Sequence, residues 1–211
     1  MKLKNFAILY VILLSTITGF CQTFEGKITY ANSFKSKNAQ IKDEQLSTML
    51  GSTQEYYIKG GDYKSVTNGA FAQWQLYINK DNKFYNKMSN SETVFWNDTS
   101  IQSDEVLKVE VNKNVTEILG YKCDEVILTC KSGVQKYYFN SKLSVESKLF
   151  SNHKFGNWYD YLSKSNSLPL KSIIDTAQFT MESTATEVKP MKLDSKTFEL
   201  PAGVKTEKSP Y

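Results

Sequence analysis

The sequence is short of several residues on which common functions depend. Its 26 basic residues are all lysine, and it has a single histidine, His153. Arginine is the residue that most often reads phosphates and guanine edges in a bidentate manner, so its absence argues against a nucleic-acid partner. With only 10 glycines and 4 prolines in 211 residues, the composition also excludes collagen-like and low-complexity disordered chains.

Motifs of catalytic and cofactor-binding sites are missing as well. The chain has no G-x-S-x-G elbow, H-E-x-x-H pair, P-loop or glycine-rich dinucleotide turn. We interpret His153 as a partly exposed loop residue and not as a general base. The adjacent acids at 43–44, 104–105 and 124–125 fit a solvated surface better than the carboxylate pair of a glycosidase. The sequence therefore predicts a non-catalytic protein that holds neither a metal nor a cofactor.

The N-terminus has the organisation of an export signal. Lys2 and Lys4 precede an unbroken apolar run over residues 6–14. This run is well short of the ~20 apolar residues that a membrane-spanning helix needs, so a transmembrane anchor is disfavoured. A positive segment followed by a short apolar segment is typical of a cleavable signal peptide.

Small residues mark the expected cleavage site. Gly19 and Cys21 stand at the −3 and −1 positions, which makes Gln22 the first residue of the mature chain. Lipid attachment at Cys21 ranks second, because the bulky Phe20 precedes it. We therefore expect residues 1–21 to be a signal peptide and the mature protein to lie in the periplasm or cell envelope.

Two cysteines remain after cleavage, Cys123 and Cys130. They lie seven residues apart in one predicted strand, which separates them by about 23 Å and points them to opposite faces. A disulfide needs Cα atoms within about 7 Å of each other. We predict that both are free, buried thiols.

The mature chain is patterned for β-structure. It is rich in aromatic residues, which favour strands, with 13 Tyr and 12 Phe in the whole sequence. In residues 24–30 apolar and polar positions alternate, as in a half-buried strand. About ten such segments follow one another, joined mostly by tight turns such as 60–61 and 131–133, which predicts an antiparallel meander.

Two segments have helical spacing instead. Residues 36–50 predict a helix that Gly51 ends, and residues 158–162 predict a weaker helical turn. The expected fold is mainly β: a strongly curved antiparallel sheet, or half-open β-barrel, with one or two helices on its concave side. We expect a single domain over residues 22–203 and a flexible tail over 204–211.

A concave sheet that its helices do not fill completely keeps an apolar cavity. Plain core packing is the alternative for any one residue. The apolar residues predicted to line this cavity are Ile28, Tyr30, Ile41, Leu46, Trp74, Leu76, Ile78, Phe179 and Met181.

Five segments, in this order, resemble a known family. They are Thr23-Phe24-Glu25-Gly26-Lys27-Ile28-Thr29-Tyr30, residues 55–60, residues 118–123, Leu168-Pro169-Leu170 and residues 193–203. The family is an uncharacterised group of exported proteins, frequent in Bacteroidota and related to the outer-membrane lipoprotein carriers LolA and LolB. The resemblance implies a half-barrel with helices over a hydrophobic cavity, and a cell-envelope location. LolA controls its lid with an arginine inside the cavity, so no functional residue can be carried over to this arginine-free chain.

These observations lead to three hypotheses of different classes. The first is a non-catalytic envelope protein that binds a lipid, an acyl chain or another hydrophobic small molecule in the concave face. The second is a periplasmic interaction module, an accessory part of an outer-membrane complex that docks on another protein. The third, which ranks last, is a hydrolase with carboxylates converging across strands.

Overall fold

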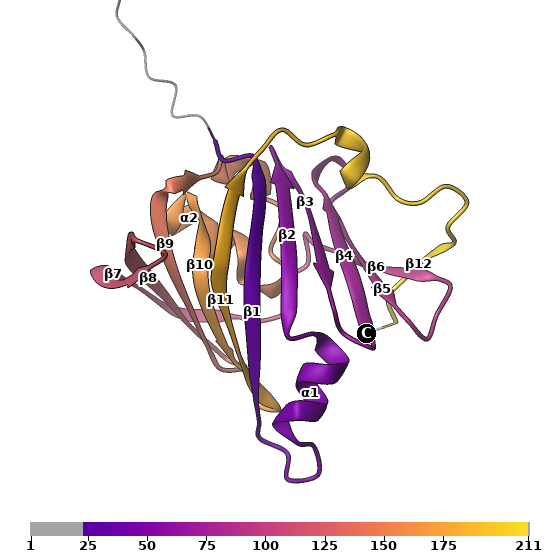
Figure 1. Cartoon of the computed structure of the whole chain (residues 1–211), viewed down its shortest axis with the longest axis horizontal. Helices are drawn as coiled ribbons and strands as arrows, with labels where there is room; N and C mark the ends of the chain where they lie inside the picture. The colour runs from indigo at the N-terminus through magenta and orange to yellow at the C-terminus, as the bar shows by residue number, and fades with distance from the viewer. Residues whose placement is uncertain (1–22, 211) are drawn as a thin grey trace, which may run out of the picture.

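Twelve strands form one curved sheet in the computed structural model, which describes residues 23–210 (Figure 1). The predicted signal peptide lies outside the described residues. The strands are β1 (Gly26–Ser36), β2 (Thr53–Lys59), β3 (Asp62–Thr67), β4 (Ala72–Ile78), β5 (Lys83–Met88), β6 (Val94–Asp98), β7 (Val106–Ile118), β8 (Tyr121–Cys130), β9 (Val134–Ser144), β10 (Ser167–Asp175), β11 (Phe179–Pro190) and β12 (Thr206–Lys208).

The strand order is β12-β6-β5-β4-β3-β2-β1-β11-β10-β9-β8-β7, so β12 and β7 are the two free edges and the sheet does not close. This confirms a mainly β, half-open barrel. Neighbouring strands are antiparallel except β12, which pairs in parallel with β6. The expectation of a wholly antiparallel sheet is therefore wrong at this edge, which is formed by residues that the sequence assigned to a flexible tail.

Two α-helices accompany the sheet, α1 (Asp43–Leu50) and α2 (Trp158–Ser165), with four short 3-10 helices at Asn79–Asp81, Ser147–Phe150, Phe155–Asn157 and Ser195–Phe198. The helix predicted over residues 36–50 begins later than expected, because β1 continues to Ser36. There the Ser36 amide donates a hydrogen bond of 2.7 Å to the Asp43 carboxylate, which fixes where α1 begins. Among the residues described, no helix has the length and apolar character to cross a bilayer.

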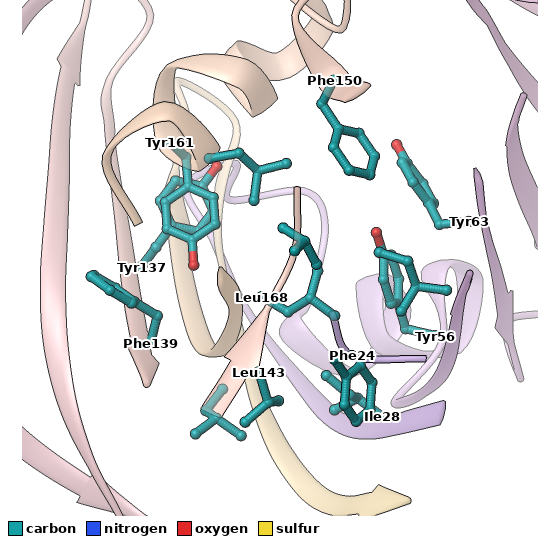
Figure 2. Close-up of a cluster of buried hydrophobic side chains, with 14 of the residues drawn as sticks. Phe24, Ile28, Tyr56, Tyr63, Tyr137, Phe139, Leu143, Phe150, Tyr161 and Leu168 are labelled. Atoms are coloured by element: carbon teal, nitrogen blue, oxygen red, sulfur yellow. The ribbon is translucent and has the colours of Figure 1, made fainter. Parts of the chain in front are cut away.

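The larger buried cluster lies on the side of the sheet that α2 covers, which we call the inner face (Figures 1 and 2). Tyr161 of α2 stacks on Tyr137 of β9 with ring centroids 4.2 Å apart, and it meets Phe139 edge to face. The Tyr161 hydroxyl donates to the Ser167 carbonyl over 2.8 Å. Burial of aromatic and leucine side chains, worth roughly 1.5–3 kcal/mol each, therefore fixes α2 inside the curve of the sheet.

A second buried cluster covers the opposite side, the outer face, at β4 and β5. Leu76 and Tyr85 pack there against Leu193 and Phe198 of the C-terminal segment. Tyr77, between Leu76 and Ile78, belongs to the inner cluster, so β4 is buried on both faces. The C-terminal segment thus does for the outer face what α2 does for the inner one.

Cys123 and Cys130 are free and buried, which confirms the prediction. Their placement on opposite faces is wrong, since both belong to the inner cluster. The alternation of buried positions along β8 is interrupted at Glu125 and Val126, opposite an irregularity in β7. Burial raises the pKa of Cys130 to about 11, so its sulfur stays a neutral thiol that accepts a hydrogen bond from the Asn157 amide.

His153 is buried, with 2% of its surface exposed, so its interpretation as an exposed loop residue is wrong. Its Nε2 lies 2.7 Å from the Tyr63 hydroxyl, and its ring contacts Tyr77 at a centroid distance of 4.3 Å. The rings that bury it come from β3, β4 and β5, which no local pattern around residue 153 reveals. Burial lowers the pKa of His153 from 6.5 to about 4.

This depressed pKa predicts a pH dependence of stability. Between pH 6.5 and pH 4 the unfolded chain protonates His153 while the folded chain does not, so stability falls as the pH falls. From pH 7 to pH 5 this site alone should cost roughly 2 kcal/mol of unfolding free energy.

Urea unfolding of the wild type and of His153→Phe at pH 7 and pH 5 measures the effect. The variant should lose this part of the pH dependence. Tyr63→Phe should keep it, because burial and not the hydrogen bond causes the shift. An unchanged slope in His153→Phe would contradict the assignment.

Candidate functional site

A cavity of about 210 Å³ lies at the centre of the inner face, between the sheet and α2. Five strands and one helix contribute its lining. The lining residues are Tyr30, Gln54, Tyr56, Tyr137, Trp158, Pro169, Ser172, Ile174, Met181 and Ser183.

The sheet register explains why space remains here. Ser172 of β10 pairs with Ser183 of β11, and Ile174 pairs with Met181. Residues two apart on a strand share a face, so the two serines face inward beside larger neighbours. Two small side chains side by side among tyrosines leave the volume unfilled.

Trp158 of α2 covers the cavity from the other side. Gly156 and Asn157 before the helix and Asn166 after it all have positive φ, at 65°, 60° and 46°. Glycine and asparagine are the residues that adopt this conformation most readily, so they turn the chain sharply at both ends of a helix of only eight residues. The helix thereby projects Trp158 towards β1, β2 and β11.

The cavity wall is polar in places but carries no ionisable acid or base other than tyrosine hydroxyls. Tyr30 donates to the Pro169 carbonyl over 2.7 Å, and Tyr137 donates to the Gln135 amide oxygen over 3.1 Å. Burial raises the pKa of both tyrosines, so both hydroxyls stay protonated.

Three further polar atoms of the wall are buried without a partner among residues 23–210: Tyr56 Oη, Ser183 Oγ and Trp158 Nε1. An unsatisfied buried donor or acceptor costs about 1–3 kcal/mol, and native proteins contain few of them. Their concentration at one cavity indicates that something other than the described chain meets them there.

A larger hollow of about 760 Å³ lies farther along the inner face, towards the β6 edge. Most of its surface is apolar. Its lining residues are Phe71, Asn86, Met88, Asn90, Ser91, Phe95, Asn97, Phe155, Ser209 and Pro210.

Amide side chains in the floor of this hollow bind one another. Gln75 donates to the Asn86 oxygen over 3.0 Å, and Asn86 donates to the Asn97 oxygen over 3.3 Å. With these amides engaged across β4, β5 and β6, the side chains left for a ligand are the phenylalanines and Met88. The hollow is therefore suited to an apolar molecule.

Tyr63, Phe84 and His153 lie between the two hollows. Phe84 contacts Phe155 at a centroid distance of 5.5 Å and Tyr63 at 6.2 Å. Tyr63 in turn stacks on Tyr56, which lines the central cavity, at 5.1 Å. A continuous set of aromatic rings thus separates the central cavity from the larger hollow.

Two of the predicted lining residues, Tyr30 and Met181, do line the central cavity. Ile28 is fully buried in the inner cluster. Phe179 packs edge to face on Phe34 at 6.0 Å, away from both hollows.

The other predicted residues lie elsewhere. Trp74, Leu76 and Ile78 face outward into the second cluster, because the C-terminal segment covers that side of β4. Leu46 is buried in α1, and Ile41 is 38% exposed in the loop before it. These five residues line neither hollow.

The larger hollow was not predicted. Its phenylalanines stand at inward positions of short strands whose outward neighbours are also apolar. Phe95, for example, lies between Val94 and Trp96, so the alternation that would single it out is absent. The local pattern offered no other signal.

Ionisable side chains do not gather at either hollow. Asp, Glu and Lys are absent from both linings. Over residues 23–210, no group of three or more His, Cys, Asp or Glu side chains is placed to hold a metal ion.

No protein-family model and no curated protein matches the chain. It is similar to three solved structures at low identity. One is PNGF-II, with 14% identity, a TM-score of 0.48, and coverage of 89% of this chain and 32% of that one, so the chain spans about a third of its length. Another is the LolA superfamily protein NE2245 from Nitrosomonas europaea, with 10% identity, a TM-score of 0.38, and coverage of 84% and 91%. The third is the Mycobacterium tuberculosis lipoprotein LppX, with 9% identity, a TM-score of 0.32, and coverage of 81% and 90%.

Proposed function

We propose that the protein is a non-catalytic cell-envelope protein that holds a hydrophobic molecule, such as a lipid or acyl chain, on the inner face of its half-open barrel. The larger hollow carries this proposal. Its volume of about 760 Å³ falls within the range of roughly 300–1,000 Å³ that is typical of small-molecule sites. Its phenylalanines and Met88 provide an apolar wall without charge.

Export supports the same reading. The N-terminal pattern of Lys2, Lys4 and the apolar run 6–14 predicts delivery to the periplasm, with Gln22 as the first mature residue. The order of five segments resembles a family related to lipoprotein carriers. A protein in that compartment meets membrane lipids and their fragments.

Phe95 provides the test. Phe95→Lys places a charge in the larger hollow, and burying an uncompensated charge against an apolar ligand is costly. We expect at least tenfold weaker binding of the uncharged fluorescent hydrophobe N-phenyl-1-naphthylamine, measured by titration. Ile101→Lys, at a site that is 55% exposed and outside both hollows, should bind the dye as the wild type does.

Lipid extraction and native mass spectrometry of protein purified from the envelope provide the second readout. A bound lipid is expected in the wild type and is expected to be depleted in Phe95→Lys. A wild-type protein that neither binds the dye nor carries any lipid would falsify the proposal.

A second candidate function, docking on another envelope protein, is favoured by β7. This edge strand pairs only with β8 among the described elements, and Leu107, Val109 and Val111 are 58%, 37% and 44% exposed. An exposed edge with apolar side chains is a template for an added strand.

Site-specific photo-crosslinking in the envelope distinguishes this candidate. A photoreactive p-benzoylphenylalanine at Val109 should give one discrete adduct if an extended segment pairs with β7. The same group at Leu149, which is 39% exposed in a 3-10 helix, is the matched control. Equal adduct patterns from the two positions, or none, would exclude docking through this edge.

A further inference from the structure

The central cavity and the larger hollow differ in chemistry. The wall of the central cavity holds three buried polar atoms without a partner among residues 23–210, on Tyr56, Ser183 and Trp158. Tyr56 is 8% exposed and Ser183 is 4% exposed, so bulk solvent does not supply the missing partners. The atom set therefore calls for polar atoms inside the cavity.

The three groups have one capacity in common. An indole N–H can only donate a hydrogen bond, whereas tyrosine and serine hydroxyls can donate or accept. All three can be satisfied by acceptor oxygens, and Trp158 by nothing else. The group that enters the cavity must therefore carry acceptors.

The charge of that group follows from the wall. No lysine lines the cavity to neutralise an anion. A buried anion without a counter-charge is strongly disfavoured. An uncharged acceptor, such as the carbonyl of an ester or amide, meets both conditions.

Size narrows the ligand further. At ~30 Å³ per water, a cavity of about 210 Å³ holds the equivalent of roughly seven waters. This is below the range of roughly 300–1,000 Å³ for a complete drug-sized ligand. The cavity is therefore matched to one part of a longer molecule.

We propose that the central cavity binds the uncharged ester or amide linkage of a neutral lipid-like ligand, with Trp158, Tyr56 and Ser183 donating to its oxygens. The adjoining apolar carbons then lie against Ile174 and Met181, the inward pair beside the two serines. This inference rests on the proposed function and adds the chemical class of the ligand to it.

The test compares three probes with matched chains: methyl octanoate, octane, and octanoate at pH 8. Binding to the full mature protein is followed by the Trp158 indole N–H resonance, assigned with Trp158→Phe. Methyl octanoate should bind at least tenfold more tightly than octane or octanoate. It should also shift the indole proton as a new hydrogen bond does, whereas octane should not.

Variants separate hydrogen bonding from shape. Tyr56→Phe combined with Ser183→Ala should reduce the preference for ester over octane to about threefold or less and leave octane binding unchanged. Tyr57→Phe is the matched control, because Tyr57 faces outward and donates to Glu55. It should keep the full preference.

Two results would overturn the inference while leaving the proposed function intact. One is equal binding of ester and octane without an indole shift. The other is a crystal structure grown with methyl octanoate in which ordered waters alone meet the three polar atoms. If no hydrophobe binds, including N-phenyl-1-naphthylamine, the proposed function fails as well.

Discussion

Because the twelve-stranded sheet curves without closing, its inner face has to be shielded from water by a short stretch of chain. Closed barrels have no such need, since their strands enclose the interior from all sides. Here α2 and the 3-10 helices beside it provide the cover, and the stack of Tyr161 on Tyr137 holds the helix in place. Both hollows exist because this cover is too small to fill the curve of the sheet.

The aromatic rings between the two hollows give the interior its division of labour. Tyr63, Phe84 and His153 fill the middle of the inner face with close ring contacts, and His153 stays neutral at the pH at which it would ordinarily begin to gain a proton. On one side the wall is apolar phenylalanine and methionine. On the other it combines tyrosine, tryptophan and serine, so a single ligand could have its apolar and polar parts recognised in different places.

Much of the fold could be predicted from local patterns, and the reasons for the exceptions are physical. The alternation in residues 24–30 identified β1, because residues two apart on a strand share a face. The same alternation separated Trp74, Leu76 and Ile78 from Tyr77 but could not say which set points inward. That depends on the C-terminal segment, which lies more than a hundred residues away in the sequence and covers the outer face.

The candidate site was less predictable, because a cavity depends on volume that is left empty. Tyr30 and Met181 were identified from their apolar character, whereas Ser172 and Ser183, which leave the space, look like ordinary polar strand residues. His153 was misjudged for a related reason. Its burial is decided by rings from three strands that are distant in sequence.

The place of β1 in the sheet has a consequence for how the chain acquires its structure. β1 lies between β2, which follows it closely, and β11, whose last residue is Pro190. The first strand therefore waits for almost the whole polypeptide before its second edge is paired, and pairings of such long range form slowly. A chain that emerges from a ribosome or a translocation channel in N-to-C order must remain largely unfolded until its C-terminal part arrives, which is the state in which a polypeptide can be threaded across a membrane.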